Sequence, residues 1–174
     1  RKERYFLAQS RDVRFQDCFS EEAVGDGMKH QRLAPLLRAN SELADVVRTK
    51  LTTVMQLALL EPVDGRGVDA EGSILVANTH LFFHPGASHI RMMQAQALLE
   101  EIGAARQEWC GDEGGGKDAA KVTVLVCGDL NSEPDTGAVE LLANGRVSSQ
   151  HYEWTEYAGF SWGAQQTEEE GEED

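Results

Sequence analysis

The sequence predicts an α/β protein, because its main elements follow one another as strand, helix, long loop and strand. An apolar, β-branched strand covers residues 73–79, and a helix with one apolar face extends from Ser88 to Ala105. A loop with three consecutive glycines, residues 114–116, then leads to a second apolar strand that begins at Val122. This order is typical of α/β proteins. The chain has 174 residues, 41% of them apolar, which is enough for one domain with a hydrophobic core.

The first half of the chain contributes shorter elements. Residues 5–8 are expected to form a short strand. From Met28 to Arg38 the apolar residues approximate helical spacing, so that Pro35 must lie in a first turn or kink the segment. Asn40 or Ser41 is expected to cap a second short helix. Helical structure is therefore predicted between the first strand and the main strands.

The middle of the chain predicts a β-hairpin followed by the long helix. Residues 52–60 combine alternating polarity with β-branched side chains, and a turn-forming cluster follows at residues 62–67. Paired with residues 73–79, they predict an antiparallel hairpin with a long loop. The apolar face of the helix is predicted to consist of Ile90, Met93, Ala97, Leu98 and Ile102. Cys127 is expected to lie inside the buried strand that begins at Val122.

The net charge of −14 is unevenly distributed along the chain. Six negative charges fall in Glu168 to Asp174, a tail that is expected to be disordered because it repels itself and buries nothing. An enzyme rich in carboxylates that recruits Mg²⁺ can also be acidic overall and still bind phosphates through the metal. Charge therefore does not exclude a nucleic-acid substrate.

Cysteine usage and the start of the chain bear on its location. Cys18, Cys110 and Cys127 are widely spaced and form no Cys-x-x-Cys pair, so structural roles in a reducing compartment are expected, without a disulfide framework. No run of about eighteen apolar residues occurs, so a soluble protein without a membrane partner is expected. The chain begins with Arg1, which suggests a cut within a longer chain. We expect an intracellular location, mitochondrial or cytoplasmic, because any targeting segment would lie outside the chain.

Both main strands end abruptly in polar residues. One strand ends at His80, and the other ends in Gly128, Asp129 and Asn131. Function is often located at such strand ends, and two polar ends suggest one shared site. If the second strand continued through Leu130, Asp129 and Asn131 would lie on one face. The alternative is a turn in which the Asp-x-Asn segment only bonds its own backbone.

Polar motifs follow one another along the second half of the chain. They are Asn78-Thr79-His80-Leu81, then Pro85, then His89-Ile90-Arg91 with Gln94, and finally Gly128-Asp129-Leu130-Asn131-Ser132 with Pro134. Together, these motifs resemble the deadenylase branch of the endonuclease/exonuclease/phosphatase superfamily, and within it the 2′-phosphodiesterases. The resemblance covers most of residues 1–155. It implies a four-layer α/β/β/α two-sheet sandwich, with residues 1–166 as the central part of that domain and residues 167–174 as an acidic tail.

The resemblance implies a Mg²⁺-dependent phosphodiesterase, an exoribonuclease that hydrolyses 2′-5′ oligoadenylate or the 3′ ends of poly(A) RNA. Phosphodiester cleavage needs an activated water and a Lewis acid on the phosphoryl oxygens. In this scheme Asp129 is the catalytic base or orients the water, and it is also a candidate metal ligand. Asn131 and His80 are the predicted phosphate contacts.

Three further residues are predicted to bind or support the substrate. By resemblance, Pro85 lies against a substrate base. Asn78, on the same face as His80, is expected to be a supporting hydrogen-bonding residue. Arg91 could reach a phosphate or form a surface ion pair with a glutamate, and the sequence favours neither.

The chain also departs from the family pattern. The metal-binding glutamate of the superfamily and its terminal Asp-His pair have no counterpart here, so the isolated chain is expected to be inactive. Alternatives are another superfamily substrate, such as DNA or a phosphoinositide, and a non-catalytic piece that binds RNA or a protein partner. A zinc site built from His80, His84 and His89 is disfavoured, because Pro85 interrupts the helix that such a ligand pair normally uses.

Overall fold

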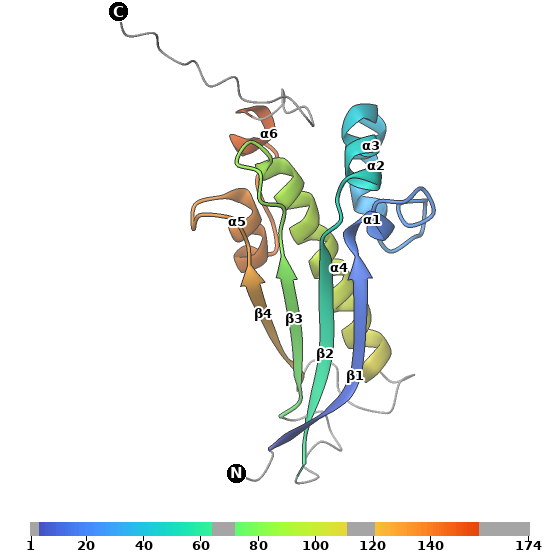
Figure 1. The fold of residues 1–174 in the computed structure, drawn as a ribbon, viewed down its shortest axis with the longest axis vertical. Helices are drawn as coiled ribbons and strands as arrows, with labels where there is room; N and C mark the ends of the chain where they lie inside the picture. Colours follow the sequence, from blue (N-terminus) through green and yellow to red (C-terminus); the bar gives the residue numbers. More distant parts are fainter. Residues whose placement is uncertain (1–3, 64–71, 111–120, 157–174) are drawn as a thin grey trace, which may run out of the picture.

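The computed structural model describes residues 4–63, 72–110 and 121–156. Four strands form one sheet in the order β1-β2-β3-β4 (Figure 1). β2 pairs antiparallel with both β1 and β3, and β4 lies parallel to β3. The tail at residues 167–174 and the predicted glycine loop lie outside the described residues. The strands are β1 (Tyr5–Arg14), β2 (Val54–Pro62), β3 (Ile74–His80) and β4 (Thr123–Asp129).

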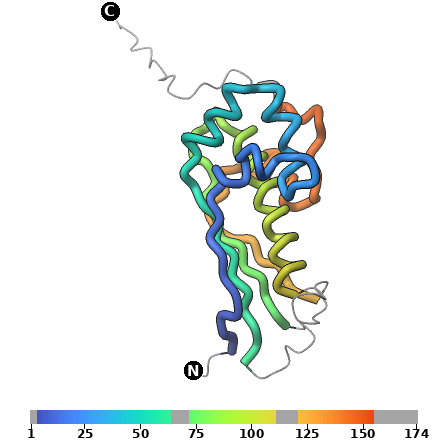
Figure 2. Tube along the Cα trace, turned by 90° about the vertical axis from the view of Figure 1, so that its right-hand side faces the viewer, coloured from blue at the N-terminus to red at the C-terminus, as the bar shows by residue number. Residues whose placement is uncertain are grey.

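The helices cover one face of this sheet (Figure 2). The longest helix, α4 (Ser88–Cys110), lies between β3 and β4 in the chain and packs against β2 and β3. A crossover helix of this kind is what permits two successive strands to run parallel. No described helix is long and apolar enough to cross a membrane. The shorter helices are α1 (Phe15–Cys18), the 3₁₀ helix η1 (Gln31–Leu33), α2 (Ala34–Ala39), α3 (Ser41–Thr49), α5 (Gly137–Asn144) and α6 (Glu153–Glu156).

Most of the elements predicted from the sequence are present. The antiparallel hairpin of β2 and β3 is confirmed, and α4 begins at Ser88 as predicted but continues to Cys110. β1 is longer than the predicted residues 5–8. Asn40 caps α3, because its side chain accepts a hydrogen bond of 2.9 Å from the Leu43 amide.

The segment between β1 and α3 is less regular than its spacing suggested. Instead of one helix from Met28 to Arg38, it contains η1 and then α2. Pro35 lies in the first turn of α2, where a missing amide hydrogen has no cost. The hydrophobic spacing was therefore right about helical structure and wrong about its continuity.

The two faces of the sheet differ in what covers them. On the helix side, alternate residues of β2 and β3 are buried under α4, with Leu57 and Leu75 each 1% exposed. On the opposite face, Leu125 of β4 is 51% exposed and the neighbouring Cys127 is exposed too. The prediction that Cys127 is buried was wrong. The helices cover a single face of β4, so residues 124–127 alternate in burial although all four are apolar.

A buried charged cluster ties the segment after β1 to α4. His30 bonds Glu100 through Nδ1 at 2.8 Å and Glu101 through Nε2 at 2.9 Å, and Lys29 donates to Glu101 at 2.9 and 3.0 Å. Burial alone would lower the pKa of His30, but hydrogen bonds with Cys18, Glu100 and Glu101 raise it to about 11. Burial would raise the pKa of Glu101, yet the bonds from His30 and Lys29 hold it below its usual value. Each buried charge therefore has a partner of opposite sign.

Candidate functional site at the ends of two parallel strands

The parallel pairing of β3 and β4 places their polar ends side by side. His80, the last residue of β3, is the register partner of Asp129, the last residue of β4. His80 Nε2 lies 3.9 Å from Asp129 Oδ2, and the two side chains are 65% and 66% exposed. The backbone continues the pairing, because the Leu81 amide donates to the Asp129 carbonyl at 2.9 Å. The predicted shared rim of the two strands is therefore present.

Beyond Asp129 the chain turns instead of extending. The Asn131 amide donates to Asp129 Oδ1 at 2.9 Å, and Asn131 has a φ of 47°, in the left-handed region. The expectation that the strand continues through Leu130 was wrong, and the Asp-x-Asn turn describes the geometry. The Asn131 side chain also donates to the Leu81 carbonyl at 2.8 Å, which joins the two strand ends. Its amide group retains a second N–H and an oxygen for a ligand.

Gly128 permits the close approach of the two strands. Its φ is 126°, and a Cβ atom at this position would collide with the Thr79 carbonyl oxygen. Glycine alone adopts this conformation without strain. The residue before Asp129 thus sets the spacing between the Asp129 and His80 backbones.

A row of polar side chains crosses the open face of the sheet next to this rim. Gln56 of β2 donates to Asp12 of β1 at 3.3 Å and accepts from Asn78 of β3 at the same distance. Cys127 of β4 then donates through its thiol to Asn78 Oδ1 at 3.8 Å. Asn78 therefore lies at the centre of a hydrogen-bonded row that spans all four strands, on the same face as His80.

The loop after β3 is held in place by Arg91, whose side chain lies in the interior. Arg91 is 5% exposed and donates to the carbonyls of Phe82 and His84 at 3.3 and 2.7 Å, and to the Ser88 hydroxyl at 2.8 Å. A longer contact of 3.5 Å reaches the Pro85 carbonyl. Arg91 is therefore buried at the base of this loop instead of lying on the surface. Its guanidinium group shapes the loop that carries Pro85.

Sequence reasoning gave no role to two residues of this loop system: Gln94, which it named only as part of a motif, and Phe83. Gln94 is completely buried, accepts from the Phe82 amide at 2.9 Å and donates to the Thr53 hydroxyl at 2.8 Å. Phe83 is 70% exposed, close in sequence to the exposed Pro85. The signal for Gln94 was its position three residues after Arg91, which puts both on one side of α4. The signal for Phe83 was an aromatic pair directly after a strand, of which only one ring can be buried.

The first turn of α4 also contains a histidine with a shifted pKa. Burial lowers the pKa of His89 to about 4, assisted by the positive charge of Arg91 and opposed by Glu153. His89 is therefore neutral at physiological pH. Among the described residues, no group of three metal-ligating side chains includes His80, His84 or His89.

At the rim, Asp129 offers a carboxylate to a hard cation. Asp129 is exposed and uses one oxygen for the Asn131 amide. Mg²⁺ is usually held by one or two carboxylates, with water and substrate phosphates as the other ligands. Asp129 thus fits the role of one protein ligand.

Comparisons with known proteins agree with this architecture. No family model matches the chain. The 2′,5′-phosphodiesterase 12 of Rattus norvegicus is 31% identical over 154 residues, which make up 88% of this chain and 22% of that protein. The CCR4-NOT transcription complex subunit 6-like of Danio rerio is 31% identical over 86 residues, or 48% of this chain and 15% of that protein. The chain spans about a fifth of the length of the first of these curated relatives.

Solved structures show the same fold. The human Nocturnin catalytic domain with bound sulfate aligns with a TM-score of 0.50 at 20% identity, over 82% of this chain and 36% of that one. ANGEL2, described as a 2′,3′-cyclic phosphatase, in complex with adenosine-2′,3′-vanadate, aligns with a TM-score of 0.50 at 22% identity, over 83% of this chain and 30% of that one. The fold is that of a partial endonuclease/exonuclease/phosphatase domain.

The sequence comparisons support an assignment of the chain to the deadenylase branch of that superfamily. Relatives of this branch include 2′,5′-phosphodiesterase 12 and the Ccr4 subunit of Aspergillus terreus, which is named a 3′-5′-exoribonuclease.

Proposed function

We propose that the protein containing this chain is a metal-dependent phosphodiesterase that hydrolyses 2′-5′ oligoadenylate or the 3′ poly(A) ends of RNA. The observation that carries the proposal is the adjacency of His80 and Asp129 at the ends of two parallel strands, 3.9 Å apart and open to solvent. The names of the relatives, a 2′,5′-phosphodiesterase and a 3′-5′-exoribonuclease, support this choice of substrate.

Asp129 is the group that acts on the attacking water. Its carboxylate is fixed by the Asn131 amide at 2.9 Å, and its second oxygen faces His80. A fixed carboxylate can orient a water molecule and accept its proton. A bound Mg²⁺ would supply Lewis acidity to the phosphoryl oxygens, and Asp129 would be its ligand from this chain.

His80 and Asn131 stabilise the negative charge of the phosphate. His80 is exposed at the rim, where its ring can donate a hydrogen bond to a phosphoryl oxygen. The second N–H of the Asn131 amide can do the same, because the first is bonded to the Leu81 carbonyl. Asn78 supports this group from the adjacent position on the same face.

The loop anchored by Arg91 would contact the substrate base. Pro85 and Phe83 are both exposed on this loop, and Phe83 offers an aromatic face. Bases stack on such side chains with little dependence on sequence. Selectivity for adenine would come from the shape that Arg91 gives to the loop.

The test measures hydrolysis of 2′-5′ oligoadenylate and poly(A) by the full-length protein with Mg²⁺. We expect Asp129→Ala to lower turnover by about 10²–10⁴-fold and Asn131→Ala by about 10²–10³-fold, with the fold intact. Asp135→Asn, an exposed aspartate on the same loop, is the matched control and should keep the wild-type rate. Near wild-type turnover in Asp129→Ala would refute the assignment.

A second measurement concerns the isolated chain. Purified residues 1–174 should show no Mg²⁺-dependent hydrolysis, because the metal-binding glutamate of the superfamily has no counterpart in these residues and Asp129 alone should hold Mg²⁺ very weakly. Cleavage by this piece that EDTA abolishes would show that it contains a second metal ligand. Activity on neither substrate by the full-length protein would favour a non-catalytic RNA-binding or partner-binding role.

A further inference from the structure

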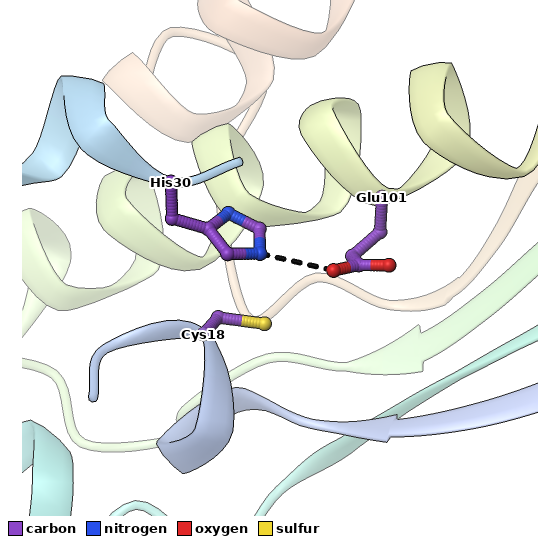
Figure 3. Close-up of side chains that lie close together, drawn as sticks. All are labelled: Cys18, His30 and Glu101. Atoms are coloured by element: carbon purple, nitrogen blue, oxygen red, sulfur yellow. Dashed lines mark hydrogen bonds and ion pairs between the residues drawn. The ribbon is translucent and has the colours of Figure 1, made fainter. Parts of the chain in front are cut away.

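Three chemically different side chains converge in the core on the helix side of the sheet. Cys18 ends α1, His30 precedes η1 and Glu101 lies in the middle of α4. They are 2%, 2% and 3% exposed, and their ligand atoms all lie within 4.8 Å of one another (Figure 3). Residues so far apart in sequence rarely bring a thiol, an imidazole and a carboxylate together in a core, because polar groups are costly to bury.

We propose that Cys18, His30 and Glu101 form a binding site for Zn²⁺. Thiolate sulfur, imidazole nitrogen and carboxylate oxygen are the three ligand types that zinc uses in proteins. Three protein ligands leave the fourth tetrahedral position to a water molecule. This site is separate from the strand ends, since none of its ligands comes from β3, β4 or the loops that follow them.

The orientation of His30 favours this assignment. Its Nε2 faces Glu101, and the thiol of Cys18 lies on the same side of the ring (Figure 3). Its Nδ1 donates to Glu100 at 2.8 Å. Zinc-binding histidines almost always make such a bond from their other nitrogen to a carboxylate or carbonyl. Glu100 therefore acts as a positioning residue that directs Nε2 towards the two other ligands.

The charges of the cluster are balanced with and without the ion. In the structure, Lys29 and His30 offset Glu100 and Glu101. Cys18 donates through its thiol to the Arg14 carbonyl at 3.7 Å. Zn²⁺ would bind in exchange for two protons, one from the thiol and one from Nε2. The two protons released carry the same total charge as the Zn²⁺ ion that binds, so the net charge of the buried cluster does not change.

The required movement is small. Zinc lies about 2.3 Å from sulfur and about 2.0–2.2 Å from nitrogen or oxygen, which places tetrahedral ligand atoms roughly 3.5 Å apart. The three ligand atoms here all lie within 4.8 Å of one another, and His30 Nε2 is already 2.9 Å from Glu101 Oε1. The Cys18 sulfur must therefore approach by at most roughly 1.3 Å, while the other two ligand atoms move slightly apart. Rotation of the Cys18 and Glu101 side chains can supply this. Bound zinc would fasten the Cys18–His30 segment to α4.

The test uses Co²⁺ as a probe, because it occupies zinc sites and absorbs light when bound to a thiolate. We expect the full-length protein to show a thiolate-to-cobalt absorption band that titrates to one equivalent, and we expect Zn²⁺ to abolish it. Cys18→Ser should remove this equivalent. Cys110→Ser, at a cysteine that is 1% exposed, and Cys127→Ser, at the exposed cysteine near the strand ends, should keep it.

A second pair of variants keeps the test decisive if Cys18→Ser does not fold. Glu100→Gln retains all three ligands and should weaken Co²⁺ binding about 10–100-fold, as loss of an orienting carboxylate does. Glu101→Gln should weaken it further, because it removes a ligand. Absence of the band in the folded wild-type protein, or its survival in folded Cys18→Ser, would overturn the proposal. Asp129→Asn should leave the band unchanged, which separates this site from the proposed hydrolytic activity.

Discussion

The ends of β3 and β4 meet at one rim, yet they are held by different means. The β4 end is fixed locally, since Gly128 permits the backbone conformation and Asp129 accepts from the Asn131 amide two residues later. The β3 end is fixed from a distance, since buried Arg91 and Gln94 of α4 bond the loop that follows it. A local turn depends on a few neighbouring residues, whereas the β3 loop depends on the position of a whole helix.

The largest effect on stability is expected from Gly128→Ala, which disrupts the local backbone conformation at the end of β4. The left-handed backbone would cost about 1–3 kcal/mol in alanine, and the collision of its Cβ with the Thr79 carbonyl a further 1–3 kcal/mol. Thermal unfolding of the full-length protein would measure the loss. Gly145→Ala is the control, because its φ is 69° but its Cβ would meet no atom within 4 Å, so it should lose only the first amount.

Arg91→Met tests the hydrogen bonds from α4 that hold the loop after β3, and it should have the next largest effect. Methionine fills much of the same volume but leaves buried carbonyl groups of the β3 loop without their donor, at a cost of about 1–3 kcal/mol. We expect hydrogen exchange to accelerate at residues 82–88 while β4 keeps its protection. Arg91→Lys should restore part of the protection with a single ammonium group. Equal acceleration in β4 would mean that the two ends are not held independently.

A smaller effect, sensitive to pH, is expected at His89 beside this loop. The folded-state pKa of about 4 lies below the ordinary value of 6.5, because burial and the charge of Arg91 disfavour the protonated ring, against the attraction of Glu153. Its contribution to stability is therefore complete above pH 6.5 and is lost as the pH falls towards 4. His89→Gln should reduce the fall in melting temperature between pH 7 and pH 4. An identical pH profile in the variant would show that protonation of His89 is not linked to folding.

The difference between a locally fixed strand end and one fixed by a distant helix also determines what could be predicted from the sequence. The β4 end was identified from sequence because the Gly-Asp-x-Asn segment forms its turn from its own neighbouring residues. The strand was nevertheless expected to continue through Leu130, whereas the chain turns there. The pairing of both strand ends also followed from the α/β order of elements. The role of Arg91 could not be predicted, because a basic residue in the first turn of a helix does not reveal that it points inward. The convergence of Cys18, His30 and Glu101 depends on tertiary packing between three segments, which no local pattern encodes.

The exposure of Cys127 makes the chain suitable for site-directed labelling. Cys18 and Cys110 are buried, so a maleimide fluorophore would react with Cys127 first among the three thiols of this chain. The thiol lies next to Asn78 on the open face, one residue from the close contact at Gly128. A dye at this position would report, through its emission, when an oligonucleotide occupies the rim, without any engineered cysteine.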